Sequence, residues 1–82
     1  MEFGDILHNL IKRDKITQYE LADEMFLSYK TISSWTCGRT EPNISQLIEL
    51  SNFFDVTVGQ LVGAEELDFT KTKIDLEEEY ER

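Results

Sequence analysis

Signals for the start of a helix recur along this chain at intervals that leave room only for short helices. They have the capping-box spacing, in which a hydroxyl or amide side chain stands three residues before Glu or Gln. The pairs are Thr17 with Glu20, Asn43 with Gln46, and Thr57 with Gln60. In each box both side chains accept hydrogen bonds from backbone N–H groups that the first turn leaves unpaired. We therefore expect new helices just after residues 17, 43 and 57.

Apolar residues at helical spacing define the first two helices. A stripe with spacings of three and four predicts a helix near the N-terminus: Phe3, Ile6, Leu7, Leu10 and Ile11. A second, short helix is expected over about residues 18–25. Its inner face would consist of Leu21, Ala22 and Met25.

The third helix is predicted over residues 29–37. Ser28 can cap its start, Ile32 and Trp35 form its buried side, and Gly38 suits a left-handed C-cap. Because Trp35 is at helical spacing from Ile32, we expect its indole to be buried in the core and not to serve as an exposed platform for stacking.

A fourth helix begins after Pro42 and Asn43, and a fifth follows Thr57 before Leu61 and Val62. The fourth has a broad apolar face, which predicts a helix central to the core: Ile44, Leu47, Ile48, Leu50, Phe53 and Phe54. Five short helices in about 64 residues leave no room for a sheet, so the predicted fold is all-α.

The charge divides the chain into a body, residues 1–64, and an acidic extension, residues 65–82. The whole chain carries a formal net charge of −9, and the extension carries more than half of it in less than a quarter of the length. Its stretch LDFTKTKI alternates in part as a strand does, and DLEEEYER would fit a short helix. The extension could pair with a second copy, lie on the body, be disordered or lead to another domain. We prefer pairing, and expect a chain ending at Gly63 to fold but to dimerise less.

Composition also restricts the setting in which the protein works. The single cysteine, Cys37, allows no internal disulfide, and no apolar run approaches the roughly 20 residues that span a bilayer. A cytoplasmic protein without a membrane partner is therefore expected. No phosphate-binding loop, catalytic triad or metal-ligand cluster is recognisable. His8 and Cys37 stand alone, so we expect no enzyme, cofactor, metal or small-molecule ligand.

Only Phe26, Leu27 and Ser28 separate the second and third predicted helices, which is helix-turn-helix spacing. Ala22 fits a close crossing of these helices because a larger side chain would hold them apart. Residues 3–63 resemble the Cro/C1-type (XRE-family) helix-turn-helix. The matching positions are Thr17-Gln18, Leu21-Ala22, Ser28, Thr31-Ile32, Trp35, Gly38, Glu41-Pro42 and Leu61-Val62-Gly63.

The resemblance implies a five-helix, lambda-repressor-like domain that binds double-stranded DNA, usually as a dimer, with the third helix in the major groove. The base-contacting residues it implies are Tyr29, Lys30, Ser33 and Ser34. The implied backbone contacts are Lys15, Thr17, Gln18, Ser28, Arg39 and Thr40, with Gln18 and nearby helix N–H groups facing a phosphate. Lys30 can donate to guanine O6 and N7, Ser34 can donate or accept, and Tyr29 can pack on a thymine methyl.

The sequence departs from the family pattern at several positions. Lys15, Phe26 and Asp55 stand where members often have Gly, so we expect positive φ angles there, with strain at Phe26. Many members also form an ion pair between the end of the first helix and the residue after the third-helix Trp. Ile11 and Thr36 occupy those positions here, and this joint loss leaves no unpaired charge.

These observations predict a transcription regulator, a repressor that binds a palindromic operator as a homodimer. The plainer interpretation of Tyr29, Lys30 and Ser34 is the polar face of an amphipathic helix; the resemblance favours base recognition. A competing hypothesis is a helix-turn-helix used as a protein-interaction module or antirepressor. That alternative would account for the acidic composition and the sparse basic face.

Overall fold

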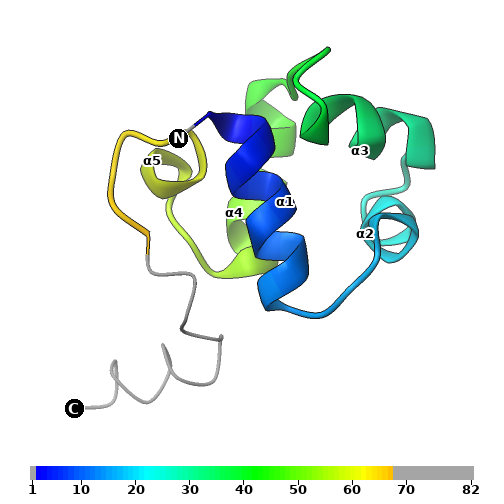
Figure 1. Cartoon of the computed structure of the whole chain (residues 1–82), viewed down its shortest axis with the longest axis horizontal. Coiled ribbons are helices and arrows are strands. Elements are labelled where there is room, and N and C mark those ends of the chain that lie inside the picture. The colour runs from blue at the N-terminus through cyan, green and yellow to red at the C-terminus, as the bar shows by residue number, and fades with distance from the viewer. Residues whose placement is uncertain (1, 68–82) are drawn as a thin grey trace.

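The structure, a computed structural model, describes residues 2–67. These residues form five α-helices and no strand, which confirms the predicted all-α fold (Figure 1). The helices are α1 (Phe3–Arg13), α2 (Gln18–Glu24), α3 (Tyr29–Thr36), α4 (Ile44–Phe54) and α5 (Val58–Leu61). The strand or short helix predicted for the acidic extension falls mainly on residues 68–82, outside the described residues.

The helices begin where the cap signals predict. Complete capping boxes form at Thr17 with Glu20, at Asn43 with Gln46 and at Thr57 with Gln60. At α3 the hydroxyl of Ser28 accepts a hydrogen bond from the backbone N–H of Thr31, at 3.3 Å. Short helices depend on such caps because most of their backbone groups lie in a first or last turn.

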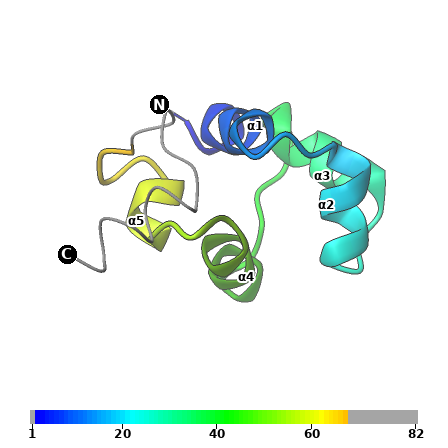
Figure 2. The same ribbon diagram turned by 90° about the horizontal axis from the view of Figure 1, so that it is seen from below.

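The core lies between α1 and the other helices. Helix α1 packs against both α3 and α5, α2 packs against α3, and α4 packs against α5. Figures 1 and 2 place α2 and α3 together at one end of the molecule and α5 at the other. The predicted stripe of α1 is buried, with Phe3 at its edge, and Trp35 is buried as expected.

The prediction for α4 was only partly right. Leu50 and Phe54 are buried, and Leu47 and Phe53 pack against the core, but Ile44 and Ile48 are 76% and 49% exposed. A helix in contact mainly with α5 buries one narrow stripe, and its broader apolar face continues into solvent. Among the described helices, α1 has the central position that the sequence suggested for α4.

Candidate nucleic-acid interface

The turn between α2 and α3 is tight and fixes the angle between the two helices. Ala22 is buried where they meet, and its carbonyl accepts the backbone N–H of Leu27 at 2.8 Å. Phe26 has a φ of 56°, and its side chain is 96% exposed. Lys15 and Asp55 also have positive φ, at 56° and 54°. The left-handed conformation expected at these three positions is confirmed.

Helix α3 has two faces of different character. Ile32 and Trp35 are buried and attach the helix to the core. The predicted base-contacting residues, at spacings of one and four, occupy other positions: Tyr29 and Lys30 are exposed, and Ser33 and Ser34 are half-buried. The helix therefore offers a polar surface along most of its length that the core does not use.

The loop after α3 is bonded back to the helix. Gly38 has a φ of 77°, as expected of a left-handed C-cap, and the backbone N–H of Arg39 donates to the Ser34 carbonyl at 3.0 Å. The hydroxyl of Thr40 donates to the hydroxyl oxygen of Ser34 at 2.8 Å. Ser34, predicted to contact a base, and Thr40, predicted to contact the DNA backbone, thus form one hydrogen-bonded unit. Arg39 lies between them in sequence with an exposed side chain.

Gln18 connects the start of α2 to the end of α3. Its Nε2 donates to Oγ1 of Thr36 at 3.3 Å, and that hydroxyl donates to the Ser33 carbonyl at 3.0 Å. Ile11, in the other position of the family ion pair, is buried. The hydroxyl of Thr36 is therefore paired within the helix-turn-helix instead of with α1.

The remaining predicted backbone contacts lie at the edges of these helices. The side chains of Thr17 and Ser28 accept the cap hydrogen bonds of α2 and α3, and both residues are exposed. Lys15 is exposed in the segment before α2. All the predicted contact residues thus lie on α2, α3 and the segments that adjoin them.

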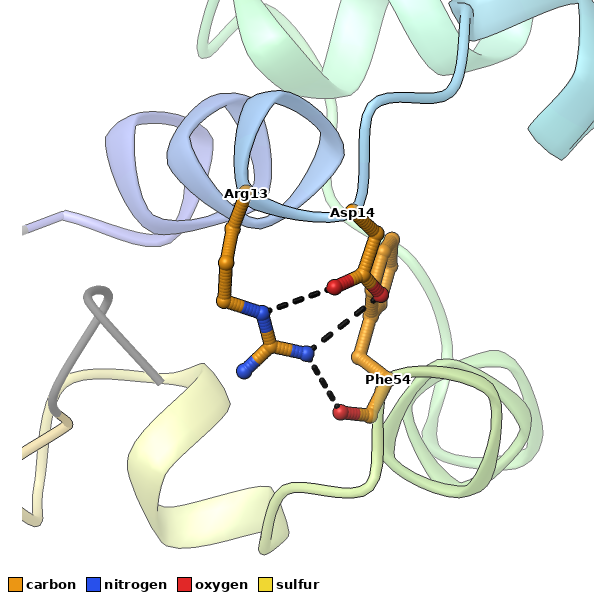
Figure 3. Close-up of polar contacts among 3 residues, drawn as sticks. All are labelled: Arg13, Asp14 and Phe54. Carbon is orange, nitrogen blue, oxygen red and sulfur yellow. Dashed lines mark hydrogen bonds and ion pairs between the residues drawn. The ribbon is translucent and has the colours of Figure 1, made fainter. Parts of the chain in front are cut away.

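Arg13 is a cation that does not contribute to the surface formed by α2, α3 and the adjoining segments. Its side chain is only 2% exposed, and its Nε lies 2.8 Å from Oδ1 of Asp14 (Figure 3). Its Nη2 donates to the carbonyl of Phe54, also at 2.8 Å, at the C-terminus of α4. Sequence reasoning missed this role because a basic residue in the last turn of a helix is ordinarily solvated.

A second missed feature is an aromatic pair beside the turn. The rings of Tyr19 and Tyr29 are stacked, with centroids 4.1 Å apart and planes inclined by 12°. Tyr29 was predicted from the resemblance, but Tyr19 was not, because its position is the outer side of α2. Their separation of ten residues has no helical period that would indicate a contact.

The other candidates are located as follows. His8 and Cys37 are exposed, and among residues 2–67 no three His, Cys, Asp or Glu side chains gather as a metal site would require. No helix of the described part has the length and apolar character needed to cross a membrane.

These features define a helix-turn-helix domain: the short turn between α2 and α3, the N-cap of α3 and the polar face of α3. The helix-turn-helix family profile matches residues 7–61, two thirds of the chain. The chain belongs to this family, in its XRE-type form, whose members are DNA-binding transcription regulators.

Two curated relatives agree with this assignment. The chain is 39% identical over 67 residues to the HTH-type transcriptional activator BcrR of Enterococcus faecalis, covering 82% of this chain and 33% of that protein. It is 30% identical over 63 residues to the uncharacterized HTH-type transcriptional regulator YqaE of Bacillus subtilis strain 168, covering 77% and 54%. The chain thus spans a third to about half of the length of these relatives.

A solved structure supports the fold. A transcriptional regulator from Listeria innocua superimposes with a TM-score of 0.74 at 23% identity, over 96% of this chain and 72% of that chain.

Proposed function

We propose that this chain binds double-stranded DNA sequence-specifically, as a cytoplasmic transcription regulator, with α3 in the major groove. The observation that carries the proposal is the division of α3 into a buried face, with Ile32 and Trp35, and a polar face that begins with Tyr29 and Lys30. A helix held in this way can enter a groove without exposing the core.

Lys30 is the strongest candidate for reading a base. It is the only cationic residue of α3, it is exposed, and its ammonium can donate to guanine O6 and N7. Ser33 and Ser34 offer weaker, more tolerant hydrogen bonds. Tyr29 can pack on a thymine methyl.

The contacts to the DNA backbone are proposed around this helix. Arg39 supplies charge from the loop after α3, and Lys15 supplies it from the segment before α2. Neutral polar residues complete the proposed set: Thr17, Gln18, Ser28 and Thr40. Such contacts fix the position of the domain on the duplex without selecting a sequence.

Selection of bound sequences from a random duplex pool tests the proposal. We expect an enriched half-site motif for the wild-type chain. Lys30→Ala should weaken binding to that site by about 1–3 kcal/mol and relax the choice at one base position. Arg39→Ala should weaken all sequences alike, and Lys12→Ala, an exposed lysine of α1, serves as the control. An unchanged motif and affinity for Lys30→Ala would contradict the groove assignment.

We further propose that the chain acts as a homodimer on a palindromic operator. Four large apolar residues on α4, on α5 and at the C-cap of α5 are exposed, and a second copy would cover them: Ile44, Ile48, Val58 and Val62. In sedimentation, Ile44→Lys should shift the mass toward the monomer. Phe26→Gly, which removes an exposed apolar side chain elsewhere, should leave the mass unchanged.

Repression is the regulatory outcome that we expect, since a dimer on an operator that overlaps a promoter excludes RNA polymerase. The relative from Enterococcus faecalis carries the name of an activator. Transcription in vitro from a promoter containing the selected operator distinguishes repression from activation.

A second candidate function is supported by charge. The chain is strongly acidic, at −9, and Arg13 is withdrawn into an internal ion pair. A protein-interaction module with little affinity for DNA would have such a surface. Failure to enrich any motif at micromolar protein and low salt would favour this function.

A further inference from the structure

The stacked tyrosines connect the two helices of the motif at the surface. Tyr19 is the second residue of α2 and Tyr29 is the first residue of α3. Their rings are nearly parallel with centroids 4.1 Å apart, although the side chains are 64% and 39% exposed. Both side chains thus lie outside the core, and the stack is a feature of the surface.

The stack restricts the side chain that faces DNA under the proposed function. A tyrosine at the start of an exposed helix has several accessible rotamers, and immobilising such a side chain on binding weakens affinity. Contact with the Tyr19 ring favours one orientation of the Tyr29 ring before DNA arrives. One face of the Tyr29 ring is then covered, which leaves the other face and the hydroxyl for a ligand.

The backbone beneath the pair is also held in place. Gln18, the neighbour of Tyr19, donates to Thr36 at the far end of α3. Ser28, the neighbour of Tyr29, caps α3 by accepting the N–H of Thr31. Consecutive residues of α2 therefore contact both ends of α3, so the two rings are supported by fixed backbone.

We propose that Tyr19 is a positioning residue for DNA recognition: it orients the Tyr29 ring and thereby determines the preference at the base that Tyr29 faces. This proposal rests on the proposed function, because it assumes that α3 reads DNA. Tyr19 acts through Tyr29 and needs no contact with DNA of its own.

The test compares full-length variants on the operator selected by the wild-type chain. Tyr19→Ala should bind about three- to tenfold more weakly and lose preference at one base position, the range expected when one more side chain must be immobilised on binding. Tyr19→Phe keeps the ring and should bind within about twofold of wild type. In a Tyr29→Ala background, Tyr19→Ala should have little further effect, because the side chain that it positions is already gone.

A measurement without DNA separates positioning from a general loss of structure. The ring protons of Tyr29 should be shifted in NMR spectra by the adjacent Tyr19 ring, and Tyr19→Ala should abolish that shift. The melting temperature should change little, because Tyr19 lies mostly in solvent.

The outcomes distinguish this proposal from the proposed function. If Lys30→Ala weakens binding but Tyr19→Ala does not, the positioning role is wrong and DNA recognition stands. Equal losses for Tyr19→Phe and Tyr19→Ala would identify a direct hydroxyl contact and overturn positioning. A wild-type chain that selects no motif would overturn both.

Discussion

Phe26 has a strained backbone conformation and an exposed apolar side chain, an unusual combination. Its φ of 56° lies in the left-handed region, where a residue with a Cβ is strained by about 1–2 kcal/mol. A bulky apolar side chain usually offsets such strain by burial, yet this one is 96% exposed. Within the described residues, the conformation is imposed by the tight turn and not by packing of Phe26.

Phe26→Gly should therefore keep or raise the stability of the domain. Relief of left-handed strain is opposed by the greater freedom of Gly in the unfolded chain. We therefore expect the free energy of unfolding to rise by at most about 1 kcal/mol. Urea unfolding of the full chain measures it. Asp55→Gly, at a φ of 54°, is the matched control and should gain less because Asp tolerates this region better. A clear fall in melting temperature for Phe26→Gly would indicate that something covers the ring.

At the scale of elements, the contact between α1 and α3 depends on a glycine, which has no side chain. Gly4 is buried at the start of α1, and a Cβ placed there would lie 2.9 Å from the carbonyl oxygens of both Trp35 and Thr36. Backbone atoms at the end of α3 cannot move aside as a flexible side chain can. Close approach of the helices therefore requires glycine at this position.

Gly4→Ala should destabilise the domain by about 1–2 kcal/mol, because forced separation of α1 and α3 outweighs the higher helix propensity of Ala. Gly59→Ala in α5 is the control: its Cβ would meet the Glu65 side chain, which can move aside at the cost of one exposed hydrogen bond from the Thr57 hydroxyl. Urea denaturation compares the variants. Equal stability of Gly4→Ala and wild type would show that α1 and α3 adjust more easily than this contact suggests.

The helices could be predicted because their signals are local. A capping box is complete within four residues, so Asn43 and Gln46 indicated the start of α4 without knowledge of the rest of the fold. The exposure of Ile44 could not be predicted in this way, since it depends on which neighbour covers α4. The same limit applies to the site: the composition of the α3 surface follows from the sequence, whereas the partner of Tyr29 is ten residues away on another helix.

At the scale of the whole molecule, the part of the chain that the structure describes offers few cations to DNA near the helix-turn-helix. In and beside the helix-turn-helix, Lys15, Lys30 and Arg39 are exposed, whereas Arg13 is paired with Asp14 and the Phe54 carbonyl. Binding to a polyanion releases about 0.9 counterion for each phosphate neutralised. The surface therefore predicts weak dependence of affinity on salt.

For a dimer, the slope of log affinity against log salt should be about −5 or flatter. Fluorescence anisotropy on the selected operator between about 50 and 200 mM salt measures this slope. Lys12→Ala again serves as the control and should leave it unchanged. A slope near −10 would require cationic contacts beyond these three residues.

The acidic extension is best tested by a cut after Leu67. Cutting at Gly63 would also remove contacts with the body: Glu65 accepts from the Thr57 hydroxyl, and the Glu66 carbonyl accepts from Nε2 of Gln60. If residues 68–82 pair with a second copy, a chain ending at Leu67 should fold, dimerise less and bind the operator more weakly. Sedimentation and operator affinity for both lengths measure the effect. A shortened chain that stays dimeric and binds more tightly would identify the extension as an electrostatic competitor of DNA.

The bond from Arg13 to Phe54 joins the end of α1, a helix that packs on α3, to the end of α4, a helix that carries exposed apolar residues (Figure 3). If α3 enters the groove and the dimer forms through α4, as proposed, this bond would help to hold the two copies of α3 in a fixed relation to each other. One base pair added between half-sites displaces them by about 3.4 Å and rotates them by roughly a tenth of a turn. A rigid link would not follow that change, so the hydrogen bond from Arg13 to the Phe54 carbonyl would narrow the range of operator lengths that the dimer accepts.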